Sequence, residues 1–151
     1  MKLMSRIAPW FLVLVMLGSG LSLAATQEMV SVASETVLLY TNPDDKSQAL
    51  WELDRGYPLK VISRKDGWIQ VQDFEKDKGW IKASTVDKTP HHIVRVHIGN
   101  IRTGPGLKNR LIGQAARYEL LSTVSKKSSW VQVKRKNGQT GWIAESLVWG
   151  W

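Results

Sequence analysis

The second half of this chain repeats the first half, and this repeat limits the possible folds more than any other feature. A shift of 62 residues aligns WIQV at Trp68–Val71 with WVQV at Trp130–Val133, and the GWI tripeptide at Gly79–Ile81 with the same tripeptide at Gly141–Ile143. Each unit has only about 60 residues, a size at which a core is marginal without disulfides or metals. Because the chain contains no cysteine, we expect the two units to pack against each other.

Between these matches the alignment of the two units slips by one residue. YPL at Tyr57–Leu59 lies opposite YEL at Tyr118–Leu120, although the segments before and after them keep the shift of 62. A loop that differs in length by one residue between the two copies would produce this pattern. We therefore expect the two units to differ at one loop.

Short segments rich in β-branched and aromatic residues alternate with glycine-containing turns in both units. Such segments favour strands, and no segment after Thr26 has a sustained helical period of apolar residues. Many short strands with almost no helix are typical of a small barrel or sandwich. The sequence therefore predicts an all-β protein.

One hairpin can be predicted in more detail. A three-residue loop at Lys136–Gly138, with its glycine in the left-handed conformation, would pair Val131 with Ile143. A two-residue Asn-Gly loop would instead pair Val133 with Trp142. We favour the three-residue loop, because it gathers the aliphatic side chains of both strands on one face.

The motif NIRTGPG at Asn100–Gly106 places two glycines around a proline. It does not match a nucleotide-binding loop, because neither the required lysine and hydroxyl residue nor a long helix follows it. Together with the downstream Trp-x-x-Val, Asn-Gly and GWI motifs, it makes Gly99–Val148 resemble the bacterial SH3-like (SH3b) domain family. Leu38–Val86 resembles a divergent copy of the same domain. This copy has Leu38, Tyr40 and Asn42 where the second copy has Asn100, Arg102 and Gly104.

The resemblance implies two tandem small SH3-like β-barrels, and the chain start predicts an N-terminal signal helix before them. Lys2 and Arg6 precede an apolar run that ends in the small residues of Ser22–Ala24, as in secretory signals. We expect a signal peptide at 1–24, the divergent domain at 28–88 and the second domain at 93–151. Cleavage after Ala24 would release the protein to the periplasm or the exterior, and a retained membrane anchor is the alternative.

The sequence does not indicate an enzyme. The three histidines, His91, His92 and His97, cluster near the junction of the two units. Adjacent residues on a strand point in opposite directions, so His91 and His92 are expected to be solvated linker residues rather than metal ligands. We expect no catalytic residues, no metal and no cofactor.

Positive charge is concentrated in the second unit. Residues 90–151 contain ten lysines and arginines and two glutamates, whereas residues 26–89 contain nine basic and eleven acidic residues. A basic surface attracts anions, and an exported protein meets little nucleic acid, so acidic wall polymer, peptide carboxylates and lipid phosphates are the expected partners. The basic patch that we expect flanks Trp130 and consists of Lys126, Lys127, Lys134, Arg135 and Lys136.

SH3-like folds bind peptides in an aromatic groove, so the resemblance implies an exposed aromatic site. The expected ligand-binding residues are Arg102, Tyr118 and Trp130, with Tyr57 and Trp68 as first-unit counterparts. Trp149 and Trp151 are expected to fill the interface between the units, and insertion into a membrane surface is the alternative.

The predicted function is that of an exported, non-enzymatic binding module that recognises cell-envelope peptide or peptidoglycan. Two alternatives are compatible with the same surface. One is a structural or assembly protein that docks onto another envelope protein. The other is a peripheral binder of anionic lipid.

Overall fold

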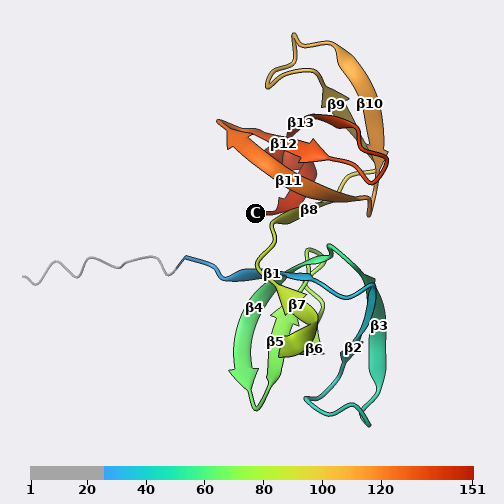
Figure 1. Cartoon of the computed structure of the whole chain (residues 1–151), viewed down its shortest axis with the longest axis vertical. Coiled ribbons are helices and arrows are strands. Elements are labelled where there is room, and N and C mark those ends of the chain that lie inside the picture. The colour runs from blue at the N-terminus through green and yellow to red at the C-terminus, as the bar shows by residue number, and fades with distance from the viewer. Residues whose placement is uncertain (1–25) are drawn as a thin grey trace, which may run out of the picture.

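The protein consists of two small β-barrels that lie end to end, one from each half of the chain (Figure 1). The structure is a computed structural model that describes residues 26–151. Within these residues, helix is limited to two 3₁₀ turns of three residues each, and no helix has the length and hydropathy needed to cross a membrane. The all-β prediction is confirmed, while the expected signal helix lies outside the described residues.

Each barrel contains seven strands and one 3₁₀ turn. The first comprises β1 (Met29–Val32), β2 (Thr36–Tyr40), β3 (Ala49–Asp54), β4 (Pro58–Lys65), β5 (Trp68–Gln72), β6 (Lys78–Lys82), η1 (Ala83–Thr85) and β7 (Val86–Asp87). The second comprises β8 (His91–Val94), β9 (Ile98–Arg102), β10 (Leu111–Ala116), β11 (Leu120–Lys127), β12 (Trp130–Lys134), β13 (Thr140–Ala144), η2 (Glu145–Leu147) and β14 (Val148–Gly150). The strand orders are β3-β2-β6-β5-β4-β1-β7 and β10-β9-β13-β12-β11-β8-β14.

The two barrels keep one register throughout. Every strand of the second barrel begins 62 residues after its counterpart in the first. The irregularity in the pairing of β4 with β5, between Val61 and Ser63, recurs between Thr123 and Ser125. The duplication therefore includes the bulges as well as the strands.

The one-residue slip expected at the tyrosines is wrong. The amide of Gly56 donates to the carbonyl of Val32, and the amide of Tyr118 donates to the carbonyl of Val94 in the same way. Tyr118 therefore occupies the position of Gly56, and both have the left-handed backbone, with φ of 70° and 86°. The likeness of YPL to YEL does not reflect equivalent positions.

Alternation of apolar and polar residues gives each barrel its own core. On β12 and β13, Val131, Val133 and Ile143 are fully buried, and each such side chain contributes roughly 1.5–3 kcal/mol by leaving water. Val131 pairs with Ile143, and Gly138 has a φ of 89°. The predicted three-residue hairpin loop is confirmed.

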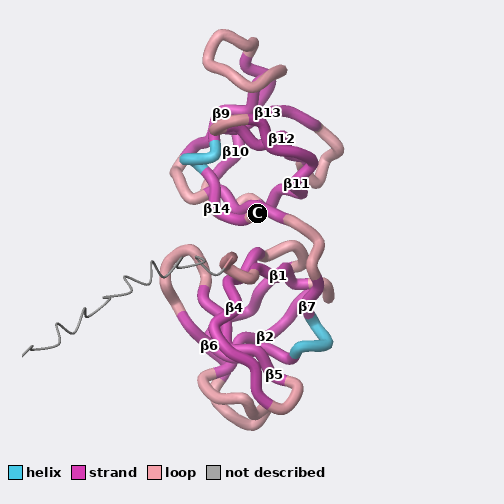
Figure 2. The backbone as a smooth tube through the Cα atoms, turned by 90° about the vertical axis from the view of Figure 1, so that its left-hand side faces the viewer, coloured by secondary structure: helices cyan, strands magenta, loops and turns pink. Residues whose placement is uncertain are grey.

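The barrels meet at a seam formed by the β5–β6 loop and β1 of the first barrel and by β8 and the β10–β11 turn of the second. Glu75 Oε1 accepts hydrogen bonds from Arg117 Nη2 at 2.8 Å and from the Tyr118 hydroxyl at 3.0 Å. His91 Nδ1 lies 3.1 Å from Ser31 Oγ. The C-terminus lies between the two barrels in both views (Figures 1 and 2), and the expected packing of the units is present.

The expectation that both junction histidines are solvated is wrong. His92 is 1% exposed inside the second barrel, where its Nδ1 lies 2.6 Å from Thr123 Oγ1. His91 packs on the seam, where a Cβ at Gly56 would lie 3.0 Å from its ring. Among residues 26–151, no cluster of three potential metal ligands is present.

Candidate functional site

A row of polar and aromatic side chains crosses the outer face of the second barrel. Trp142 on β13 pairs with Arg102 on β9 and with Gln132 on β12, and directly paired residues lie on the same face of a sheet. Trp130 precedes Gln132 by two residues on β12, so it lies on this face too. The opposite face is the barrel core, so this row lies at the surface.

The first barrel carries a corresponding row, in which Tyr40 takes the place of Arg102. Tyr40 and Gln70 both pair with Trp80, and Trp68 precedes Gln70 on β5. The rings of Tyr40 and Trp68 meet edge to face, with centroids 5.7 Å apart. The duplication thus produced two copies of one aromatic face.

The two copies differ in what covers the first tryptophan of the row. In the first barrel, Lys82 Nζ lies 5.6 Å from the centroid of the Trp68 ring, within range of a cation–π interaction, and it also lies 3.1 Å from Asp45 Oδ2. At the shift of 62, Lys82 corresponds to Ala144 and Asp45 to Leu107. The second barrel therefore lacks the ion pair that covers Trp68.

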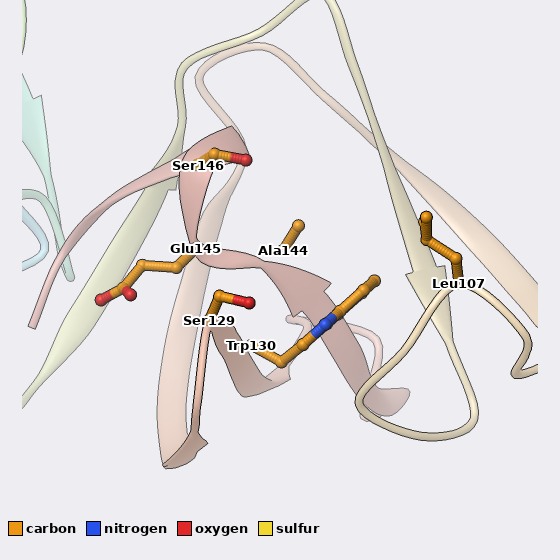
Figure 3. A pocket seen from close by; sticks show the side chains of 6 residues that line it. All are labelled: Leu107, Ser129, Trp130, Ala144, Glu145 and Ser146. Atoms are coloured by element: carbon orange, nitrogen blue, oxygen red, sulfur yellow. The ribbon is translucent and has the colours of Figure 1, made fainter.

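Trp130 consequently borders an open pocket of about 590 Å³. Figure 3 shows its ring extending toward Leu107, a residue that is 77% exposed, with Ala144 on the side of Trp130 away from Leu107. The Glu145 carboxylate lies on the opposite side (Figure 3), 3.1 Å from Lys126 Nζ. The Trp130 pocket, as we call it, is lined by Leu107, Ser129, Trp130, Ala144, Glu145 and Ser146.

The loop between β9 and β10 holds Leu107 beside this pocket. Arg102 Nη1 donates to the carbonyl of Asn109 at 3.0 Å, and Asn109 Nδ2 donates to the carbonyl of Gly106 at 3.3 Å. A Cβ at Gly104 would lie 2.7 Å from Asn109 Oδ1, so a side chain at this position would displace the Asn109 side chain. Arg102 braces the loop from the outer face of the barrel.

The structure does not bring the predicted ligand residues onto one face. Tyr118 lies at the seam, where its ring centroid is 5.8 Å from that of Phe74, and it does not join Trp130. Tyr57 is half-buried near the same place, where burial first, and then the charges of Asp73 and Glu75, raise its pKa above the ordinary value. Left-handed backbone at Tyr118 directs its side chain toward the first barrel, which sequence spacing could not indicate.

The expected basic patch is divided as well. Lys126 and Lys127 lie beside the start of β12, where Lys127 pairs with Trp130. Lys134 and Lys136 lie at the other end of that strand, roughly 13 Å away. Arg135 is bound to Glu119, with Nε–Oε1 and Nη2–Oε2 distances of 2.6 and 3.0 Å. The hairpin thus separates residues that are neighbours in the sequence around Trp130.

The predicted ligand-binding residues did not include Leu107 or Ala144, and they omitted Gln132 and Trp142, although the predicted hairpin register places these two on the same face as Trp130. A comparison of the two copies, position by position, could have indicated Leu107 and Ala144 from the sequence. At the shift of 62, a lysine and an aspartate of the first unit correspond to an alanine and a leucine of the second unit. Loss of a charged pair beside a retained tryptophan indicates a face that has become accessible.

Comparisons with known proteins agree with the duplicated architecture. Two family models, each described as "Bacterial SH3 domain", match residues 33–88 and 98–148. The chain is 24% identical over 141 residues to "Putative N-acetylmuramoyl-L-alanine amidase YrvJ" of Bacillus subtilis (strain 168). This match covers 83% of the chain but only 27% of the relative, so the chain spans about a quarter of that protein's length.

Two solved structures also match the chain at low sequence identity. An NlpC/P60 family protein from Bacillus cereus ATCC 10987 is 13% identical with a TM-score of 0.38, over 82% of this chain and 56% of that one. The structure named "Endolysin LysPBC5 CBD" is 14% identical with a TM-score of 0.32, over 82% of this chain and 93% of that one. On the evidence of the two family matches, the chain belongs to the bacterial SH3 domain family and carries two such domains in tandem.

Proposed function

We propose that this protein is an exported, non-enzymatic module that binds peptidoglycan or another peptide-bearing polymer of the cell envelope through the Trp130 pocket. The difference between the two copies of the aromatic face supports this proposal most strongly. Lys82 covers Trp68 in the first barrel, whereas Ala144 leaves the Trp130 ring accessible beside an open pocket. One copy maintains its barrel, and the other offers a surface to a ligand.

The chemistry of the pocket suits a wall peptide or sugar. The Trp130 indole and the Leu107 side chain offer apolar surface to a ring or an aliphatic side chain, and a rigid indole loses little conformational entropy on binding. The Ser129 and Ser146 hydroxyls, which also line the pocket, can form hydrogen bonds with amide or sugar hydroxyl groups. An open site of this kind binds each unit weakly, but a polymer with many repeats increases retention through avidity.

The amidase relative supports the same class of ligand. Its name denotes an enzyme that acts on the N-acetylmuramoyl-L-alanine linkage, which is where peptide joins glycan in peptidoglycan. The segment shared with this chain amounts to about a quarter of that protein, and in this chain it consists of SH3 domains. Attachment to the wall is therefore the role that we propose for this chain, and the expected signal peptide at 1–24 is consistent with export.

Replacing Trp130 by alanine should release the protein from peptidoglycan. An aromatic residue at the centre of a site typically contributes 2 kcal/mol or more, so we expect about 30-fold weaker binding. Retention of the mature protein on purified peptidoglycan, measured across a series of polymer concentrations, tests this. Trp68→Ala is the matched control, because it removes the corresponding, covered tryptophan, and its retention should remain within about twofold of the parent protein.

A second variant tests the pocket while keeping the tryptophan. Ala144→Lys with Leu107→Asp introduces the ion pair found at Lys82 and Asp45, so it should cover Trp130 and reduce retention without altering the barrel. Equal retention of all variants would contradict the proposal. So would a parent protein that does not bind peptidoglycan at modest salt, or one that binds only anionic vesicles, which would favour the lipid alternative.

A further inference from the structure

A second hollow, of about 460 Å³, lies at the seam and is built from both barrels. It is separate from the Trp130 pocket and shares no lining residue with it. The hollow is lined by Phe74, Glu75 and Lys76 of the β5–β6 loop, and by Arg95, Arg117 and Trp149 of the second barrel.

The hollow is cationic. Of its four charged side chains, Arg117 and Glu75 form an ion pair at 2.8 Å. Within residues 26–151, no carboxylate lies within 4 Å of the side-chain nitrogens of Lys76 or Arg95. The nearby Asp73 carboxylate accepts hydrogen bonds from amides of its own loop. Two positive charges therefore face this hollow without a neutralising partner.

Lys76 reaches this position at a cost in backbone energy. Its φ is 77°, and the corresponding residue of the second barrel is Gly138, with a φ of 89°. The two loops are otherwise closed alike, because the amides of Asp73 and Arg135 donate to the carbonyls of Asp77 and Gln139. Left-handed backbone costs a residue with a Cβ roughly 1 kcal/mol. Glycine at the corresponding position of the second barrel avoids this cost.

We propose that the seam hollow is a second binding site, which takes a short peptide through a free carboxylate. Lys76 and Arg95 would bind the carboxylate, and guanidinium groups suit the planar geometry of its two oxygens. Phe74 and Trp149 would pack against the peptide on either side. Since Glu75 joins Arg117 and Tyr118 across the seam, the walls are held in place before the ligand arrives, which favours binding.

The test is an NMR titration of the mature protein with acetyl-Ala-Glu-Ala as the free acid and with its neutral analogue, acetyl-Ala-Gln-Ala amide. With the free acid we expect saturable shifts of the Trp149 indole N–H and of the Lys76 and Arg95 amides. The neutral analogue should bind about tenfold more weakly, because the hollow recognises the carboxylate.

Two variants identify the cations. Lys76→Gly and Arg95→Gln should each weaken binding about tenfold, while Lys136→Ala removes a lysine from the corresponding loop of the second barrel and should not. Lys76→Gly should leave the Tm unchanged or higher, because glycine already occupies this position in the second barrel. Lost binding in that variant therefore cannot be attributed to unfolding.

Three results would overturn the proposal: no saturable shift at the seam, equal binding of the two peptides, or equal binding of the parent protein and Lys76→Gly. Binding to phosphatidylglycerol vesicles that Lys76→Gly abolishes, without any peptide shift, would assign the hollow to lipid phosphate and would also overturn it. Trp130→Ala should still bind the peptide at the seam, so failure of the proposed wall binding and failure of this site remain distinguishable.

Discussion

Replacing Gly141 by alanine should destabilise the second barrel by about 3 kcal/mol. Gly141 opens the GWI motif on β13, where this strand crosses β9. An added Cβ would overlap Ile101 Cγ2 and would lie 2.9 Å from Ile112 Cδ1 and 3.0 Å from the Arg102 carbonyl oxygen. Ile101 is fully buried, and a close-packed core cannot relieve such an overlap without moving the backbone. The repeated glycine-tryptophan pair is thus a packing requirement.

Chemical denaturation of the parent protein and the variant measures this loss. The matched control is Gly138→Asn, because Gly138 has a φ of 89° but no atom within 4 Å of an added Cβ. Asparagine tolerates the left-handed conformation, so this change should cost less than about 1 kcal/mol. A loss for Gly141→Ala no greater than that of the control would contradict the close approach of β13 to β9.

Acidification should lower the free energy of unfolding by up to about 3 kcal/mol through His92. The Thr123 hydroxyl donates to the carbonyl of Trp151 at 2.8 Å, so His92 Nδ1 must donate to Thr123 Oγ1. The neutral tautomer with its proton on Nδ1 satisfies this arrangement, and burial disfavours the charged ring. Burial, followed by the charge of Lys126, lowers the pKa of His92 to about 4 from the ordinary 6.5.

Acid lowers the stability because the unfolded chain binds a proton at His92 at a higher pH than the folded protein does. In the unfolded chain His92 takes up a proton as the pH falls through 6.5, whereas in the folded protein its pKa is about 4. His92 therefore has no effect above pH 6.5, and the stability lost grows as the pH falls from 6.5 to about 4. Unfolding free energies measured across this range give the slope.

The control for this titration is His92→Val, because the first barrel has Val30 at the corresponding position. Asp73, whose pKa is raised by burial, is present in both proteins. The difference between the two curves therefore isolates His92. Parallel curves between pH 4 and 6.5 would contradict the assignment of a neutral, buried imidazole.

The barrels were predictable because their determinants are local. The repeat, the glycine motif and the alternation along β12 and β13 each reflect backbone geometry, so they indicated strands, the hairpin register and the family together. The confirmed pairing of Val131 with Ile143 depended only on which side chains must be apolar. Such patterns are visible in one sequence.

The site was less predictable because it depends on which positions are equivalent in space. Tyr57 and Tyr118 look alike in the sequence, yet Tyr118 occupies the position of Gly56, since both residues have left-handed backbone. Similarity of residue types in the sequence cannot reveal this structural equivalence. Likewise, the direction of the hydrogen bond between His92 and Thr123 depends on Trp151, whose carbonyl orients the Thr123 hydroxyl across 28 residues of sequence.

The most direct test of the central claim is to observe each tryptophan while a ligand binds. Side-chain indole N–H signals in ¹⁵N-labelled mature protein, assigned by single substitution, can be followed during titration with soluble disaccharide-peptide fragments of peptidoglycan. We predict saturable shifts of Trp130 and Trp142 and unchanged signals from Trp68 and Trp80. Equal shifts of Trp68 and Trp130, or no shift of Trp130, would contradict the claim that only the second barrel presents an open aromatic face.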